Sequence, residues 1–208
     1  MFLIELLFIN PILYLMIAVS ILFGFTIHEY SHAQASYFLG DPTAKYQGRL
    51  TLNPLAHFDP FFTSLIFIIG IGMGKPVPFN PLNLRNQKWG PSLVALAGPA
   101  SNLLMALIVG VSLRFLEFSN IGLVYFLTCF TWINIILGVF NLLPIPPLDG
   151  SYIFLASLPS SFERIKISLL AGGPFLIIFA IFFMWFIGFP FICRPLFILI
   201  TGMPSLPF

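Results

Sequence analysis

The stretch that decides the fold runs from Pro11 to Ala33 and reads Pro-Ile-Leu-Tyr-Leu-Met-Ile-Ala-Val-Ser-Ile-Leu-Phe-Gly-Phe-Thr-Ile-His-Glu-Tyr-Ser-His-Ala. No charged residue occurs in it before His28. Pro11 suits the first turn of a helix, and Gly40-Asp41-Pro42 predicts the helix end. About 29 helical residues would extend roughly 43 Å, which exceeds the ~30 Å hydrocarbon core of a bilayer. The stretch therefore predicts a membrane-spanning helix with His28 in its last turns, near one membrane face.

The end of this helix carries the pattern His-Glu-x-x-His at residues 28–32. Two histidines four residues apart project from the same helix face, one turn apart. That spacing lets both imidazoles reach one tetrahedral Zn²⁺ at about 2.0–2.1 Å, and Glu29 could take a proton from a zinc-bound water. A histidine pair packed only against neighbouring helices is the alternative. It would leave His28, Glu29 and His32 in lipid without a metal, so we favour the metal site.

The composition is that of an integral membrane protein. The 208 residues are 59% hydrophobic and 8% charged, whereas a soluble domain carries about 25% charged residues. The net charge is +2 and no basic block suggests a nucleic-acid partner. Cys129 and Cys193 lie in apolar surroundings and have no metal-binding spacing. We expect one domain over residues 1–208, with a catalytic core over about 11–160.

The remaining apolar segments predict an all-α, multi-pass protein with about four to six transmembrane helices. Further spans are expected over about 91–115, 121–143 and 167–188, and the tail 189–208 is too rich in proline to assign. Residues 61–74 are apolar, but about 14 residues make only roughly 21 Å of helix, which suits a re-entrant or interfacial segment. After the first helix, alternation at Tyr46, Gly48, Leu50 and Leu52 predicts a short strand or β-hairpin-like loop.

A second chemical feature follows the third span, where residues 144–150 read Pro-Ile-Pro-Pro-Leu-Asp-Gly. So many prolines cannot continue a helix, and unwound backbone at membrane depth is tolerated only where it is buried in protein or lines a cavity. A catalytic zinc takes three protein ligands, and His-Glu-x-x-His supplies two. If 61–74 does not cross the membrane, the third span returns to the face of His28 and His32, and Asp149 can join them. His57 and Asp59 stay open as alternative ligands, although hydrogen bonding within their loop is the favoured interpretation.

The basic residues predict the orientation of the chain. With 61–74 re-entrant, one face holds Lys45, Arg49, Lys75, Arg85, Lys88, Arg164 and Lys166, and the other holds Arg114 and Arg194. The positive-inside rule then places the site at the cytoplasmic face, in what we expect to be a bacterial plasma membrane.

Three motifs together resemble the site-2 protease family of intramembrane zinc metalloproteases. They are His28-Glu-Tyr-Ser-His32, Leu96-Ala-Gly-Pro-Ala-Ser-Asn102 and Asn141-Leu-Leu-Pro-Ile-Pro-Pro-Leu-Asp-Gly150. Gly48-Arg-Leu-Thr-Leu-Asn-Pro-Leu-Ala-His-Phe-Asp-Pro60 and Lys75-Pro-Val-Pro-Phe-Asn-Pro81 resemble a compact branch without PDZ or CBS modules. The resemblance covers about residues 15–160.

The resemblance implies a role for each matched residue. His28, His32 and Asp149 would ligate zinc, and Glu29 would be the general base. Asn141 would hold the substrate carbonyl or its oxyanion, and Asn102 would contact the substrate strand. The implied reaction is hydrolysis of a peptide bond within or near a transmembrane segment of a membrane protein substrate in the lipid bilayer.

Two other classes use similar residues. A membrane metal-binding or metal-transport protein could use the same ligands without hydrolysing peptides. A prenyl-protein-type membrane metalloprotease would take its third ligand from a later glutamate, and Glu163, beside Arg164 and Lys166, is the candidate.

Overall fold

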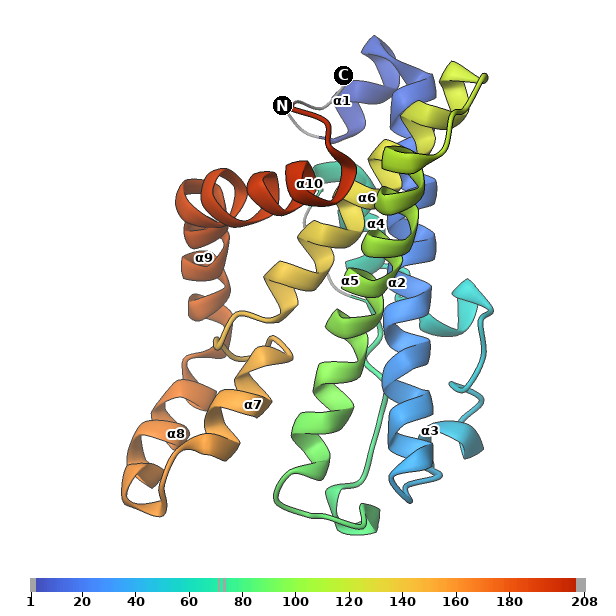
Figure 1. Ribbon diagram of the computed structural model, residues 1–208. Coiled ribbons are helices and arrows are strands. Elements are labelled where there is room, and N and C mark those ends of the chain that lie inside the picture. The colour runs from blue at the N-terminus through green and yellow to red at the C-terminus, as the bar shows by residue number, and fades with distance from the viewer. Residues whose placement is uncertain (1–2, 71, 73, 205–208) are drawn as a thin grey trace.

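The computed structural model describes residues 3–70, 72 and 74–204, and within them it contains helices and loops but no strand (Figure 1). Four helical segments are long and apolar enough to cross a membrane: α2 (Pro11–Phe38), α5 (Gly90–Phe115), α6 (Ile121–Asn141) and the segment Phe175–Thr201. The prediction of an all-α, multi-pass membrane protein is therefore confirmed. The other helices are α1 (Leu3–Ile9), α3 (Thr43–Tyr46), η1 (Pro54–His57), α4 (Phe62–Ile69), η2 (Pro81–Asn83), α7 (Gly150–Ser157), η3 (Ser160–Phe162), α8 (Glu163–Ala171), α9 (Gly173–Phe183), η4 (Met184–Cys193) and α10 (Arg194–Thr201).

The ends of the long helices follow from local sequence. The Asn10 side chain accepts the backbone N–H of Leu13 and Pro11 occupies the first turn, so α2 begins with its orphan donors partly satisfied. Asn120 caps α6 in the same way. At the other end of α2, Gly40 adopts φ +109°, a backbone conformation that side chains disfavour, and the chain turns away.

Helices α2, α5 and α6 pack closely around small and polar residues (Figure 1). A Cβ added to Gly24 on α2 would lie 3.0 Å from the Asn134 side chain of α6. A Cβ on Gly138 of α6 would lie 2.7 Å from the Leu103 side chain of α5. Small residues are what allow membrane helices to approach this closely. This three-helix unit positions the functional site.

The C-terminal helices pack on the other side of α5 and α6. Figure 1 shows α9 upright and the continuation through η4 and α10 turning across the bundle. Phe197, which is 1% exposed, packs there with Ile135 and Cys193. The fourth span lies further along the chain than the expected 167–188, because α8 ends at Ala171 and a separate helix follows. The tail left unassigned from sequence is helical up to Thr201, and residues 205–208 lie outside the described part.

Residues 58–74 leave the site end of the bundle and return to it. The backbone N–H of Lys75 donates to the carbonyl of His57 at 3.1 Å, so the two ends of this excursion meet. Between them, α4 packs against α1, and the hydroxyl of Tyr14 near the start of α2 donates to the Phe67 carbonyl at 3.3 Å. The segment therefore reaches toward the start of α2 and returns to the end of the bundle that it left.

The β-hairpin-like loop expected after the first helix is wrong. Residues 43–46 form the helical turn α3, and Gly48 at φ +68° interrupts any extended run. Tyr46 and Leu52 are both exposed, so the alternating pattern does not mark one buried face. The turn forms because the Asp41 carboxylate accepts both the N–H and the hydroxyl of Thr43, which favours a local turn over a strand.

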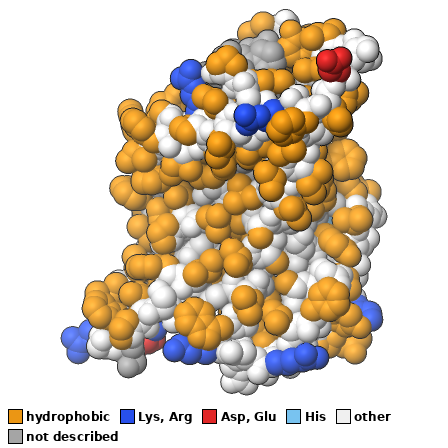
Figure 2. Space-filling model, in the orientation of Figure 1, with side chains coloured by type: hydrophobic (Ala, Val, Ile, Leu, Met, Phe, Trp, Pro, Cys, Tyr) orange, Lys and Arg blue, Asp and Glu red, His pale blue; other side chains and the backbone are white. Residues whose placement is uncertain are grey.

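The surface agrees with a membrane-embedded protein. Figure 2 shows hydrophobic side chains over most of the visible face, with the Lys and Arg side chains of that face near its two ends. Exposed apolar side chains such as Phe23, Leu104, Ile108 and Phe179 lie on the candidate spans. In water such a surface would be unfavourable, whereas in lipid it costs nothing.

Candidate metal centre

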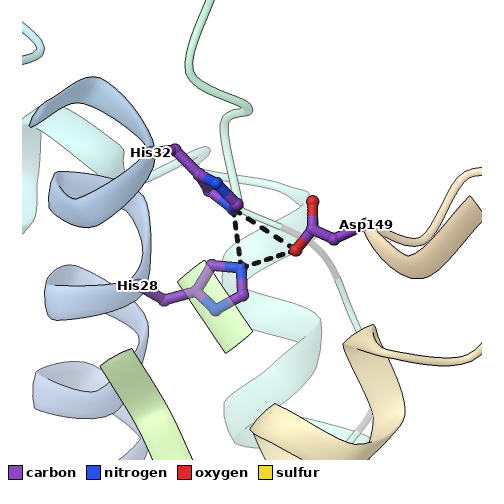
Figure 3. Close-up of side chains that lie close together, drawn as sticks. All are labelled: His28, His32 and Asp149. Carbon is purple, nitrogen blue, oxygen red and sulfur yellow. Dashed lines mark hydrogen bonds and ion pairs between the residues drawn. The ribbon is translucent and has the colours of Figure 1, made fainter. Parts of the chain in front are cut away.

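Three side chains from two distant parts of the chain converge beside α2 (Figure 3). His28 and His32 project from one face of α2, and Asp149 comes from the proline-rich break between α6 and α7. The two Nε2 atoms are 3.0 Å apart, and Asp149 Oδ2 lies 3.1 Å from that of His28 and 3.3 Å from that of His32. Both histidines are buried, at 5% and 8% exposure. The three residues form a group that could hold a metal ion.

The tautomers of the two histidines are set by their other ring nitrogens. His28 Nδ1 lies 2.6 Å from Oδ1 of Asn102, and His32 Nδ1 lies 2.8 Å from the carbonyl of Val94. Both partners are acceptors, so each neutral ring carries its hydrogen on Nδ1. The Nε2 lone pairs then face one another and the Asp149 carboxylate. Three acceptor atoms in mutual contact repel unless a cation or a proton lies between them.

The donor set and its spacing fit zinc. Ligand atoms about 2.0–2.1 Å from a tetrahedral zinc lie roughly 3.3–3.4 Å apart. The distances of 3.0, 3.1 and 3.3 Å between the three atoms are close to that value. Two imidazoles and one carboxylate are also a donor set that catalytic zinc sites use, with a fourth position left open.

Glu29 lies next to the first of these histidines and is also buried, at 7% exposure. Its Oε2 atom accepts the backbone N–H of Val77 at 3.2 Å. One carboxylate oxygen therefore binds a loop segment. The negative charge of Glu29 also acts on His32. A buried carboxylate this near to metal-capable histidines is suited to proton transfer.

Comparison with known proteins agrees with this arrangement. The model of peptidase family M50 matches residues 114–168. "Putative zinc metalloprotease YwhC" of Bacillus subtilis is 41% identical over 142 residues, which cover 64% of this chain and 65% of that protein. "Putative zinc metalloprotease Rip2" of Mycolicibacterium smegmatis is 31% identical over 153 residues, covering 68% of this chain and 58% of that protein. The chain is similar to peptidase family M50 over residues 114–168, and to these two relatives over about two thirds of its own length.

The resemblance to site-2 proteases is thereby confirmed. Each alignment covers less than two thirds of the relative, at 65% and 58% of its length. The part of the chain that the family model matches includes Asn141 and Asp149 and lies well after His28 in the sequence. No solved structure matches the chain.

Asn102 lies behind His28. It has no exposed surface; Oδ1 accepts from His28, and Nδ2 donates to the Gly24 carbonyl and to Asn134 Oδ1, each at 2.9 Å. These two donor bonds fix which end of the amide faces the imidazole. From the sequence, an interhelical hydrogen bond and contact with substrate are both open for Asn102. Its burial and its bonds to His28 and Asn134 agree with the first, and we assign Asn102 to holding His28.

Asn141 is the last residue of α6 and lies half-buried, shortly before the break that carries Asp149. Its Nδ2 atom donates to the Leu137 carbonyl, one turn back, at 3.0 Å. An amide nitrogen carries two N–H groups, so this bond engages only one of them.

The alternative ligands lie elsewhere within the described residues. His57 is 1% exposed, and its Nε2–H donates to the Thr51 carbonyl at 2.8 Å. Burial lowers the pKa of His57, so it is a neutral hydrogen-bonding group. Asp59 accepts the N–H of Phe61 at the start of α4, and Glu163 pairs with Lys166 on α8 at 3.5 Å. The metal-capable group of this region contains none of the three.

Several functional contacts were not foreseen from the sequence. A Cβ on Gly98 would lie 2.4 Å from His32 Nε2 and 2.7 Å from His28 Cε1, so α5 touches both imidazoles at this glycine. The Gly98-Pro99 pair within an apolar run was a visible signal of close approach. The carbonyl of Val94 and the N–H of Val77 are backbone groups, so their roles cannot be predicted from the pattern of side chains.

Proposed function

We propose that this protein is an intramembrane zinc metalloprotease that hydrolyses a peptide bond within or near a transmembrane segment of a membrane protein. The observation that carries the proposal is the mutual contact of three acceptor atoms, from His28, His32 and Asp149, at the end of the helix on which buried Glu29 directly follows His28. The names of the relatives support it, because YwhC and Rip2 are both described as zinc metalloproteases.

Zinc held by His28, His32 and Asp149 would polarise a water molecule and lower its pKa toward about 7. Glu29 takes the proton from the attacking water and later gives it to the leaving amine. The second N–H of Asn141 donates to the developing oxyanion. Asn102 and the Val94 carbonyl keep the two imidazoles in the tautomer that presents Nε2.

The site lies in the second half of a membrane-spanning helix. The substrate that can reach it is therefore a transmembrane segment of another protein. The backbone of a transmembrane substrate is internally hydrogen-bonded, so it must unwind locally before its carbonyl becomes accessible. We place the site near the cytoplasmic face of a bacterial plasma membrane, since the basic residues lie mainly on that side. The whole chain of 208 residues acts as one domain in this proposal.

The test combines metal analysis with a cleavage assay in detergent micelles. The substrates are a panel of single-span reporters, each with a helix-breaking Gly-Pro pair near its cytoplasmic end and a fluorescent tag. Wild type and Glu29→Gln should each hold about one zinc per chain, and Asp149→Ala should lose it. Only wild type should cleave.

Cleavage that survives Glu29→Gln would overturn the role of Glu29. A zinc-loaded wild type that cleaves no reporter but passes zinc across liposome membranes would establish metal transport instead. Zinc retained by Asp149→Ala but lost from Glu163→Ala would favour the prenyl-protein type of membrane metalloprotease.

A further inference from the structure

Two loop segments that the proposed reaction does not use meet beside Glu29. The first is the loop with Arg49 and His57. The second is residues 75–80, Lys-Pro-Val-Pro-Phe-Asn, here called the strap. The strap passes the general base at its centre, where Val77, 9% exposed, gives its backbone N–H to Glu29 Oε2 at 3.2 Å.

Both ends of the strap are fixed. At the far end, the N–H of Asn80 donates to Oδ2 of the fully buried Asp41 at 2.6 Å. At the near end, the N–H of Lys75 donates to the His57 carbonyl at 3.1 Å, and its own carbonyl accepts from Arg49 Nη2 at 2.5 Å. The near end is therefore held by one backbone bond and by one charged side chain.

Arg49 is buried, but its guanidinium group is not fully hydrogen-bonded. It is 5% exposed, and its Nη2 also reaches His57 Nδ1 at a long 3.4 Å. Its Nε atom is buried without a hydrogen-bond partner, and within the described residues it forms no ion pair. The negative charge that acts on it is that of Glu29. A buried, incompletely paired guanidinium is unfavourable for folding alone, and such exceptions gather at functional sites.

The strap is stiff enough to transmit a displacement. Lys75 and Val77 each precede a proline, and a residue before proline is restricted to extended backbone. In an extended chain, residues two apart direct their backbone groups to the same side. Fixing the carbonyl of Lys75 therefore also sets the direction of the Val77 N–H.

We propose that Arg49 is a positioning residue for the general base: by binding the Lys75 carbonyl it holds the strap so that the Val77 N–H orients the Glu29 carboxylate. The inference rests on the proposed proteolytic function. Within the described residues, the hydrogen bonds of Arg49 go to Lys75 and His57, and none goes to the metal-capable group. The loss of Arg49 should therefore act on the chemical step and spare metal and substrate binding.

The experiment measures kcat and KM separately on the best reporter, together with zinc per chain, for Arg49→Ala and Arg49→Lys. A misplacement of about 1 Å at a reacting group can cost roughly 100-fold in rate. We expect Arg49→Ala to lower kcat by about that factor, with KM within about two-fold of wild type and zinc unchanged. The lysine variant keeps one donor for the Lys75 carbonyl and should recover about ten-fold of the loss. Arg85→Ala removes an exposed arginine before α5 and is the matched control, expected to behave as wild type.

A second readout does not need activity. Val77→Cys in a chain whose buried Cys129 and Cys193 are replaced should react slowly with a maleimide, faster when Arg49→Ala is added, and no faster with Arg85→Ala.

An unchanged kcat in zinc-loaded Arg49→Ala, or unchanged labelling at residue 77, overturns the inference. A raised KM at unchanged kcat does so too, because Arg49 would then bind substrate. If Arg49→Ala does not fold, wild-type kcat in Arg49→Lys together with faster labelling at residue 77 overturns the inference, because the strap would then be loosened without effect on the reaction. A wild type without peptidase activity defeats the proposed function alone, since labelling still reports on the strap.

Discussion

The two zinc-binding candidates on α2 are oriented by different kinds of partner. His32 donates to a main-chain carbonyl, which no substitution can remove, whereas His28 donates to the side chain of Asn102. That side chain in turn depends on Asn134 and Gly24. At the scale of single residues, a substitution of Asn102 therefore changes the support of the metal site while all three candidate ligands stay in place.

Asn102→Ala should weaken zinc binding by about 10- to 100-fold, the usual effect of removing a group that orients a metal-binding histidine. The substitution leaves the Nδ1–H of His28 and the Gly24 carbonyl without their buried partner. Competition with a chromophoric chelator measures the affinity. Thr128→Ala is the control, because Thr128 is equally buried but its hydroxyl bonds only within its own region of α6 and to Met203. Equal zinc affinity of the Asn102 variant and wild type would show that His28 needs no such support.

The sequence predicted the candidate ligands but not what orients them. The pattern at residues 28–32 defines its own geometry, because four residues make about one helical turn. Asp149 could be added by asking which segments cross the membrane. The contact between Asn102 and His28 joins residues 74 apart, and its existence depends on how α5 packs on α2 at Gly98. No local periodicity encodes that packing.

At the scale of elements, one carboxylate connects the end of α2, the turn α3 and the strap. Asp41 accepts hydrogen bonds from Thr43, Asn80 and Asn83. Burial by itself would raise the pKa of Asp41, but these hydrogen bonds outweigh it and hold the pKa below its usual value. The ionised form is thus stabilised in the folded protein more than in the unfolded chain.

This shift predicts an acid-dependent stability. A carboxyl whose folded pKa is depressed contributes fully above its unfolded pKa of about 3.9, and the contribution is lost as the pH falls through the folded value. Thermal unfolding in detergent should show Asp41→Asn less stable than wild type at about pH 6, with the difference shrinking toward about pH 2. Glu117→Gln, at an exposed carboxylate, should track wild type throughout. A difference between Asp41→Asn and wild type that does not change with pH would contradict the assignment.

Elements were predicted well where the signal was local and poorly where it was not. Asn10-Pro11 and Asn120 mark the starts of α2 and α6, and both helices begin there. The hairpin expected around Gly48 failed because a strand needs a partner, while the Asp41 turn satisfies the same backbone groups without one. The length of 61–74 was enough to favour a re-entrant or interfacial segment over a span, but not to choose between the first two.

At the scale of the whole molecule, the arrangement of the site depends on Lys45 and Lys75 lying on one side of the membrane. In a chain without Cys129 and Cys193, Lys45→Cys and Lys75→Cys should react with an impermeant maleimide from the same side, and Arg114→Cys from the other. All three native side chains are exposed, so labelling reports membrane side and not burial. In right-side-out vesicles of a bacterial plasma membrane, only Arg114→Cys should react. Opposite labelling of residues 45 and 75 would mean that 61–74 crosses, and the ligand set could not assemble.

The hydrogen bond between Lys75 and His57 has a further consequence for how this chain could vary. The bond between Lys75 and His57 sets the distance between the two ends of the segment 58–74, whatever its length, while α4 within it makes its own contacts with α1 and Tyr14. The entropy of closing such a loop changes only slowly with its length. The segment between His57 and Lys75 can therefore change in length or sequence to suit a different neighbour in the bilayer. The backbone that faces Glu29 would keep its position.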